Sequence, residues 1–162
     1  AQRRGDAVLL AQSGDRTAEL VRVAERCEDL MRTDGLLPQD ILVLTYRRDR
    51  AGQLAEAIAH RIGSDKVRCA FRGPEKDDLA IQPDRLTVST VASAKGYDAP
   101  YVLVASLEDF TEEVEGRVSL YVGCTRARDW LEVGWAKTTP LVPRDDETIP
   151  ERTIPHPTPP AA

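Results

Sequence analysis

One arginine in this sequence, Arg126, stands at the point where a helical pattern passes directly into a strand pattern. The stretch from Ser119 to Trp135 carries Thr125-Arg126-Ala127 at the end of its helical part, and a strand-like run follows. Such a junction places a guanidinium group at the edge of a sheet, where α/β proteins bind phosphates. The residue types and their spacing therefore predict phosphate chemistry at Arg126.

A second segment with unusual chemistry lies upstream, at residues 86–98. It ends in Lys95-Gly96-Tyr97-Asp98 and is followed by an apolar run at residues 101–105. A lysine and a glycine in succession are, by themselves, the chemistry of a plain turn. Together with the arginine junction, however, they form a combination that is far more specific than either segment alone.

The sequence lacks the loop that holds phosphates in nucleotide hydrolases. Such a loop is rich in glycine and ends in Gly-Lys-Ser or Gly-Lys-Thr, so that it cradles the phosphates and places magnesium. No Gly-Lys pair occurs anywhere in the chain. Glu108 and Asp109 follow an apolar strand pattern, but without such a loop we interpret them as the solvated start of a helix or loop. Phosphate chemistry must therefore be completed by another domain.

Composition indicates a globular protein with one domain. The chain has 162 residues, of which 41% are hydrophobic and 30% charged, and a chain of this length can bury a core. The net charge of −5 argues against a strongly basic coat for nucleic acid, but not against a narrow groove. Three widely spaced cysteines in apolar patterns predict reduced thiols, a cytoplasmic location and no metal site. No apolar run is long enough for a membrane span, so we expect no membrane partner.

Hydrophobic periodicity predicts alternating strands and helices. Helical patterns cover residues 17–32, 49–62 and 113–128, and strand patterns cover residues 7–12, 41–46, 67–71, 86–91, 101–106 and 131–136. Apolar strands alternating with helices predict βαβ units, and hence an α/β fold whose mostly parallel sheet has helices on both faces. In the last helix, we expect the side chains of Val114, Val118, Tyr121, Val122 and Thr125 to face the sheet.

The chain changes character at Thr138. Seven of its eleven prolines lie between this residue and the C-terminus. Proline donates no backbone hydrogen bond and suits neither ladders nor helix interiors, so the segment is expected to be a linker or disordered. The sequence thus predicts a folded domain at residues 1–137 and a proline-rich disordered tail or linker at residues 138–162.

Three segments resemble sequence motifs of superfamily 1 helicases of the UvrD/Rep type. Residues 90–98 resemble motif V, residues 120–128 resemble motif VI, and residues 40–47 resemble motif IVa. The resemblance extends over residues 7–136 with the motifs in the order of that family. It implies the C-terminal, second RecA-like domain of such a helicase, with a three-layer α/β fold.

The resemblance also implies roles for four residues. Arg126 matches the arginine finger that reaches the γ-phosphate of ATP across a domain cleft. Gly96 and Asp98 match the pair that approaches the nucleotide, the glycine because a bare backbone fits close to phosphate and the acid because it can accept from a ribose hydroxyl. Thr90 matches a contact to the backbone of single-stranded DNA. ATP with Mg²⁺ would be bound mainly by the N-terminal RecA-like domain of the same parent protein.

The sequence departs from the family pattern at residues 92 and 98 and leaves alternatives open. Ala92 stands where a histidine is usual, Asp98 is shorter than the usual glutamate, and residues 72–85 occupy the place of a large helical subdomain in many members. Arg126 could instead be a cation that interacts with the end of its own helix. The alternative function is a helicase-like module that binds nucleic acid or a protein and has lost catalysis.

Overall fold

The computed structural model describes residues 8–70, 83–94, 97–137, 139 and 141. The strands are β1 (Leu9–Gln12), β2 (Ile41–Thr45), β3 (Val67–Cys69), β4 (Leu86–Thr90), β5 (Ala99–Val104) and β6 (Ala127–Trp135). The α-helices of the described ranges are α1 (Arg16–Arg32), α2 (Arg48–Ile62) and α3 (Val114–Cys124). A short 3-10 turn at Leu107–Asp109 follows β5, and another at Ala92–Ala94 follows β4.

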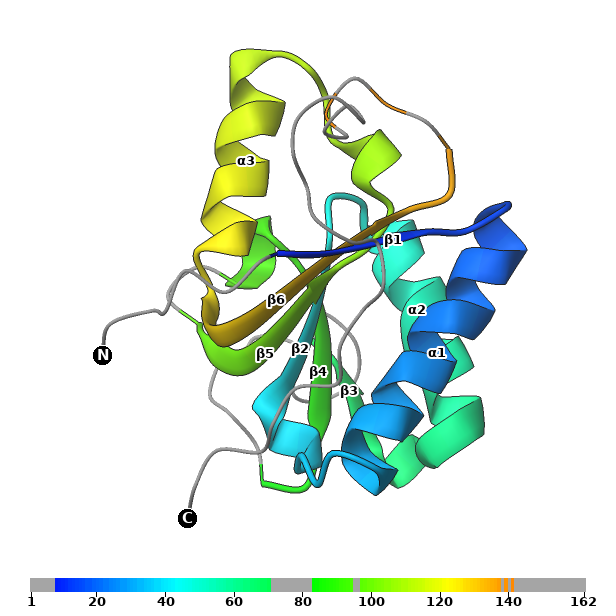
Figure 1. Ribbon diagram of the computed structural model, residues 1–162. Helices are drawn as coiled ribbons and strands as arrows, with labels where there is room; N and C mark the ends of the chain where they lie inside the picture. Colours follow the sequence, from blue (N-terminus) through cyan, green and yellow to red (C-terminus); the bar gives the residue numbers. More distant parts are fainter. Residues whose placement is uncertain (1–7, 71–82, 95–96, 138, 140, 142–162) are drawn as a thin grey trace.

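All six strands belong to one parallel sheet in the order β1-β6-β5-β2-β4-β3. Helices α1 and α2 lie on one side of this sheet and α3 lies on the other, so the domain has three layers (Figure 1). The predicted RecA-like α/β fold is therefore confirmed. Within the described ranges, no helix is both long and apolar enough to cross a membrane.

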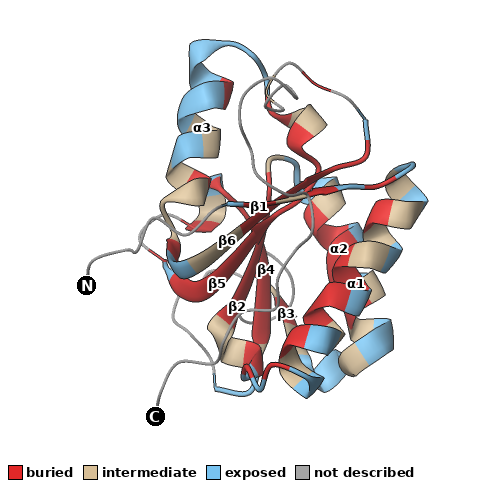
Figure 2. Ribbon diagram, in the orientation of Figure 1, coloured by how far each residue is buried: buried red, intermediate tan, exposed pale blue. Residues whose placement is uncertain are grey.

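The central strands are buried on both faces, as expected for a parallel sheet between helices. Every residue of β2, β4 and β5 is buried (Figure 2). Alternate residues of β2 contribute to two separate cores: Ile41 and Val43 pack with α1 and α2, and Leu42 and Leu44 pack with the segment that follows β4. Leu141 also packs against the second core, and Thr139 is 8% exposed.

The start of α1 is fixed by its N-cap. Asp15 has an extended backbone and its side chain accepts a hydrogen bond from the backbone amide of Ala18 at 2.7 Å, which satisfies one of the free donors at a helix start. At the other helix of this layer, Gly63 ends α2 with a φ of 107°. Only glycine adopts such a conformation without strain.

A buried ionic cluster joins α1 to the sheet. The carboxylate of Glu132 in β6 is 0% exposed and lies 3.4 Å from Arg22 and 3.7 Å from Arg26, while the Tyr101 hydroxyl donates to it at 3.4 Å. Burial raises the pKa of Glu132, and the two guanidinium groups oppose that shift. A Cβ at Gly134 would lie 2.2 Å from Arg22 Nη2, so the glycine leaves room for the guanidinium to reach Glu132.

The prediction for the last helix was wrong in its end and in the orientation of three side chains, whereas the half-buried Val122 packs against the second core as predicted. Helix α3 stops at Cys124 because β6 begins at Ala127, four residues earlier than the strand pattern predicted. The side chains of Val114, Val118 and Tyr121 point away from the sheet, with 78%, 54% and 70% exposure. The buried positions of α3 are Gly116 and Gly123.

Close backbone packing explains this reversal. A Cβ at Gly116 would lie 2.2 Å from the carbonyl oxygen of Thr111, and one at Gly123 would lie 3.0 Å from Val91 Cγ2. The inner face of α3 thus approaches its neighbours too closely for side chains at these two positions. Hydrophobic periodicity indicates an apolar stripe, but it does not indicate which body covers the stripe.

Candidate functional site

Arg126 lies in the two-residue connection between α3 and β6. Thr125 ends the helix, with its hydroxyl donating to the Val122 carbonyl at 2.7 Å, and the backbone amide of Arg126 donates to the Gly123 carbonyl at 3.2 Å. These bonds satisfy carbonyl groups that a helix end leaves unpaired. They also fix where the Arg126 side chain leaves the backbone, at the amino edge of β6.

The guanidinium group of Arg126 bonds to neutral oxygens of its own helix end. Its Nε donates to the Val122 carbonyl at 3.3 Å and its Nη2 to the Thr125 hydroxyl at 3.4 Å. Among the described residues, no salt bridge joins Arg126 to a carboxylate. The half-buried guanidinium therefore keeps a positive charge that an incoming phosphate could neutralise.

The structure brings Arg126 and Asp98 together. The backbone amide of Ala99 donates to the Arg126 carbonyl at 3.1 Å, so Asp98, which immediately precedes Ala99 and is exposed, lies beside the arginine at the amino edge of the sheet. Two residues that are distant in sequence but share an implied role at a nucleotide thus meet at one edge. Gly96, the third residue with this role, lies outside the described residues.

Thr90 lies at the opposite edge, where β4 ends. Its register partner in β2 is Thr45, the last residue of that strand, so Thr90 lies at the carboxyl edge of the sheet, whereas β5 begins at Ala99 on the amino edge. Thr90 is 3% exposed, and its hydroxyl accepts a hydrogen bond from the backbone amide of Ser93 at 3.2 Å. The Thr90 side chain is therefore not itself open to a ligand, whereas Ala92 in the following turn is exposed and Ser93 is half-buried.

The carboxyl end of β2 lies between strands whose connections leave in opposite directions. The chain after β2 enters α2 on one face of the sheet, whereas the chains after β4 and β5 enter the other face (Figure 1). In parallel sheets, ligands commonly bind beyond the carboxyl ends of the strands at such a switch in direction. Arg47, Arg48 and Arg50 begin α2 at this edge.

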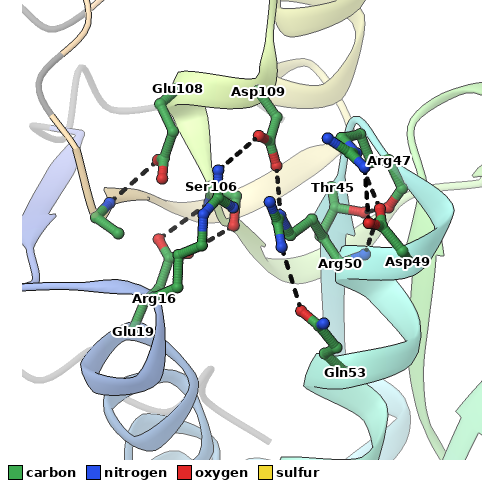
Figure 3. A network of polar contacts seen from close by, with 11 residues as sticks. Arg16, Glu19, Thr45, Arg47, Asp49, Arg50, Gln53, Ser106, Glu108 and Asp109 are labelled. Atoms are coloured by element: carbon green, nitrogen blue, oxygen red, sulfur yellow. Dashed lines mark hydrogen bonds and ion pairs between the residues drawn. The ribbon is translucent and has the colours of Figure 1, made fainter.

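Sequence analysis missed a network of polar side chains at the carboxyl edge (Figure 3). The Asp109 carboxylate is 6% exposed and pairs with Arg16 at 3.2 Å and with Arg50 at 3.0 Å. Glu108 accepts from the backbone amide of Ala136 at 3.1 Å, and its other carboxylate oxygen is buried. The interpretation of Glu108 and Asp109 as a solvated loop start was therefore wrong, because both carboxylates tie together segments that are far apart in sequence.

Glu19 completes this network from α1. Its carboxylate accepts from the backbone amide of Ser106 at 3.0 Å and also from the Ser106 hydroxyl. Ser106 has a φ of 55°, a left-handed conformation that is uncommon outside glycine. The two hydrogen bonds hold this turn and so direct the chain after β5 toward α3.

The burial of Glu19 predicts how the stability of the fold changes with pH. Burial raises the pKa of the Glu19 carboxyl, the Ser106 hydrogen bonds oppose the shift, and the negative charge of Glu108 adds to it. A carboxyl group with a raised pKa in the folded state stabilises the fold most at low pH, and this contribution is lost as pH rises through the folded pKa. Wild type should therefore lose stability as pH rises from about 4 to about 7, and Glu19→Gln should not. We expect the difference in free energy of unfolding, Glu19→Gln minus wild type, to be larger at about pH 7 than at about pH 4.

Urea unfolding at the two pH values measures this difference. The matched control is Glu25→Gln on the same helix, because the Glu25 side chain is 53% exposed and pairs with Arg61 at the surface. A pH trend in Glu25→Gln as large as that in Glu19→Gln would mean that the buried site is not its source.

The described residues contain no group of three or more His, Cys, Asp or Glu side chains that could hold a metal ion. The thiol of Cys27 is buried, and burial raises its pKa to about 12. Cys27 therefore remains protonated at neutral pH and behaves as a small hydrophobic residue.

Comparison with solved structures supports the fold. The chain is similar to the C-terminal domain of a possible DNA helicase from Lactobacillus plantarum WCFS1, with a TM-score of 0.61 and 18% sequence identity over 82% of this chain and 75% of that one. No protein-family model and no curated protein sequence matches the chain. At this identity the similarity establishes only that the two chains share a fold, and the function must be argued from the site.

Proposed function

We propose that this domain is the second motor domain of an ATP-dependent DNA helicase or translocase of the UvrD/Rep type. The observation that carries the proposal is the meeting of Arg126 and Asp98 at the amino edge of the sheet, through the 3.1 Å hydrogen bond from Ala99 to Arg126. Both residues match nucleotide-facing positions of that family. The similarity of fold to the C-terminal domain of a possible DNA helicase supports the same proposal.

In this proposal, ATP and Mg²⁺ are held by the N-terminal RecA-like domain of the parent protein. Arg126 approaches the γ-phosphate from outside that domain and stabilises charge that develops during phosphoryl transfer. To do so, the guanidinium exchanges its bonds to Val122 and Thr125 for bonds to phosphate oxygens. Phosphate oxygens carry negative charge and can accept two parallel bonds from a guanidinium group, whereas the Val122 carbonyl and the Thr125 hydroxyl are uncharged and accept one bond each.

Single-stranded DNA is proposed to bind at the carboxyl edge. The exposed Arg47 supplies positive charge there, which suits a phosphate backbone. Arg47 pairs with Asp49 through bonds of 3.0 and 2.8 Å, and both side chains are about half exposed. DNA phosphates can therefore compete for Arg47 in water, where such surface pairs contribute little.

The second candidate is a helicase-like module without catalysis. The bonds from Arg126 to Val122 and Thr125 suit a cation at the negative end of a helix dipole equally well. In that case the parent gene would lack a phosphate-binding loop, and Arg126 would contribute only to the stability of α3.

The purified chain is expected to hydrolyse no ATP under the first proposal. Arg126 and Asp98 supply only one wall of a nucleotide site, and the chain contains no loop to cradle phosphates. Release of phosphate from ATP by the 162-residue chain, measured with and without a magnesium chelator, checks this expectation. Chelator-sensitive turnover above the blank would show that the chain holds a complete site.

A further inference from the structure

Tyr46 is a half-buried aromatic residue at the carboxyl edge of the sheet. It directly follows Thr45, the last residue of β2, and precedes the exposed Arg47. Its ring centroid lies 5.1 Å from that of Phe110, and the two ring planes are tilted by 52°. Phe110 is 2% exposed and belongs to the second core. The Tyr46 ring therefore packs on a buried aromatic neighbour while part of the side chain stays in contact with solvent.

The backbone on both sides of Tyr46 is fixed by hydrogen bonds. The Thr45 carbonyl accepts from the backbone amide of Val91 at 2.9 Å, and the Thr45 hydroxyl donates to the Arg47 carbonyl at 2.7 Å. The same Arg47 carbonyl accepts from the backbone amide of Ala51 at 3.2 Å, in the first turn of α2. Figure 3 shows the Thr45 and Arg47 ends of this connection. A ring held in place before binding costs little conformational entropy when a flat ligand packs on it.

The hydroxyl group of Tyr46 has no partner among the described residues, in contrast to the buried tyrosines. The Tyr97 hydroxyl is 3.2 Å from that of Thr87, and the Tyr101 hydroxyl contacts Arg26 at 3.2 Å. Buried tyrosines usually bond in this way. Packing on Phe110 requires only an apolar side chain at position 46, so the fold itself does not account for a tyrosine there.

The neighbouring Arg47 indicates which flat ligand suits the ring. An aromatic side chain beside an arginine is the combination that binds single-stranded nucleic acid, because bases stack on the ring and phosphates pair with the cation. The base and the phosphate of one nucleotide are separated by a single sugar, so adjacent residues suit both. In a duplex, each base is already stacked on its neighbours and offers the ring no free face.

We propose that Tyr46 is a stacking platform for one base of a single-stranded nucleic acid whose phosphate pairs with Arg47. This inference rests on the proposed function, because it takes the carboxyl edge as the place where the strand binds. The platform is expected to accept any base, since every base has an aromatic face. It should favour a single strand over a duplex.

Substitution of Tyr46 in the parent protein tests the platform. Tyr46→Leu keeps an apolar side chain against Phe110 but removes the aromatic face, and it should weaken binding of a single-stranded oligonucleotide by about 5- to 150-fold, the usual effect of losing one stacking ring. Tyr46→Phe keeps the ring and should bind within about twofold of wild type. Fluorescence anisotropy at fixed salt without ATP measures both affinities.

Tyr121→Ala is the matched control, because Tyr121 is a tyrosine of α3 with 70% exposure. Its affinity for the oligonucleotide should equal that of wild type. The thermal midpoint of Tyr46→Leu should stay close to that of wild type, which separates loss of stacking from loss of fold. Wild-type affinity in Tyr46→Leu, or an equal loss in Tyr46→Phe and Tyr46→Leu, would overturn the proposal.

An abasic site in the oligonucleotide identifies the base that stacks. When this site is moved along the strand one position at a time, wild type should lose affinity at the position that meets Tyr46. Tyr46→Leu should show no further loss at that position, because the ring and the base act as one pair. Equal losses in the two proteins at every position would refute the stacking contact.

The dependence on salt separates this inference from the proposed DNA edge. Arg47→Ala should reduce the slope of log affinity against log salt concentration by about 0.7, the value for one phosphate contact on a single strand, whereas Tyr46→Leu should leave the slope unchanged. If only Arg47→Ala weakens binding, the platform is refuted and the proposed edge stands. If neither does, the strand binds elsewhere and both fail, while the proposed role of Arg126 is tested separately by ATP hydrolysis.

Discussion

Replacing Arg126 by alanine is expected to lower ATP hydrolysis by the parent protein about 10³- to 10⁵-fold, the range known for arginines supplied across a cleft in phosphoryl transfer. This corresponds to about 4 to 7 kcal/mol of transition-state stabilisation. Binding of ATP should stay within about tenfold of wild type, because the partner domain holds most of the nucleotide and the arginine acts mainly on the transition state. Steady-state ATPase assays with saturating single-stranded DNA measure the loss.

Arg128→Ala is the matched control for this substitution. Arg128 is exposed in β6, two residues beyond Arg126. We expect Arg128→Ala to have a much smaller effect on hydrolysis. Equal losses in the two variants, accompanied by unfolding, would instead indicate that Arg126 has a structural role at the end of α3.

The largest effect on stability is expected from Glu132→Ala. This substitution removes the buried carboxylate that lies 3.4 Å from Arg22 and 3.7 Å from Arg26, whose side chains are 22% and 9% exposed. Removal of one partner from a buried ionic cluster costs about 3–5 kcal/mol. Thermal unfolding of the chain should show a midpoint lower by about 10 °C or more.

Glu25→Ala provides the comparison for Glu132→Ala. Glu25 pairs with Arg61 at 2.7 Å, but both side chains are exposed, at 53% and 39%. Surface pairs contribute about 0–1 kcal/mol, so its midpoint should change little. A small change in both variants would mean that Arg22 and Arg26 find other partners once Glu132 is absent.

Local sequence patterns were sufficient to predict the layers of the fold. The apolar runs of β2, β4 and β5 are fully buried, which is why they lack the alternation of a half-exposed strand. The prediction that Arg126 lies between a helix and a strand is also confirmed, although β6 begins at Ala127, earlier than the strand pattern indicates. These features depend on residues that are neighbours in the sequence.

The features that sequence analysis missed depend on contacts between distant residues. Asp109 is paired with Arg16 and Arg50, which lie 93 and 59 positions away. Glu132 stands between Leu131 and Val133 in a strand pattern, and its contacts with Arg26, with Tyr101 and with Arg22, which is 110 positions away, account for its burial. A charged residue in a sequence gives no sign of a buried partner unless the register of the sheet is known.

The orientation of α3 could not be predicted for a related reason. Its apolar stripe was recognised correctly, but a stripe is equally compatible with packing on its own sheet and with packing on another body. The signal that could have distinguished these cases is the pair of glycines, Gly116 and Gly123, which mark the face of close backbone approach. The predicted domain boundary at residues 137 and 138 stays a prediction, as do the roles of Gly96, Asp98 and Thr90.

The central claim is that Arg126 contacts the transferring phosphate of an ATP held by another domain. The most direct measurement is the affinity of the parent protein for ADP with aluminium fluoride, a mimic of the transition state, compared with its affinity for ATP in wild type and in Arg126→Ala. The account predicts that the substitution weakens binding of the mimic by at least about 10²-fold while ATP binding changes by less than about tenfold. Equal changes in the two affinities would contradict the claim and leave Arg126 as a cation that stabilises the end of α3.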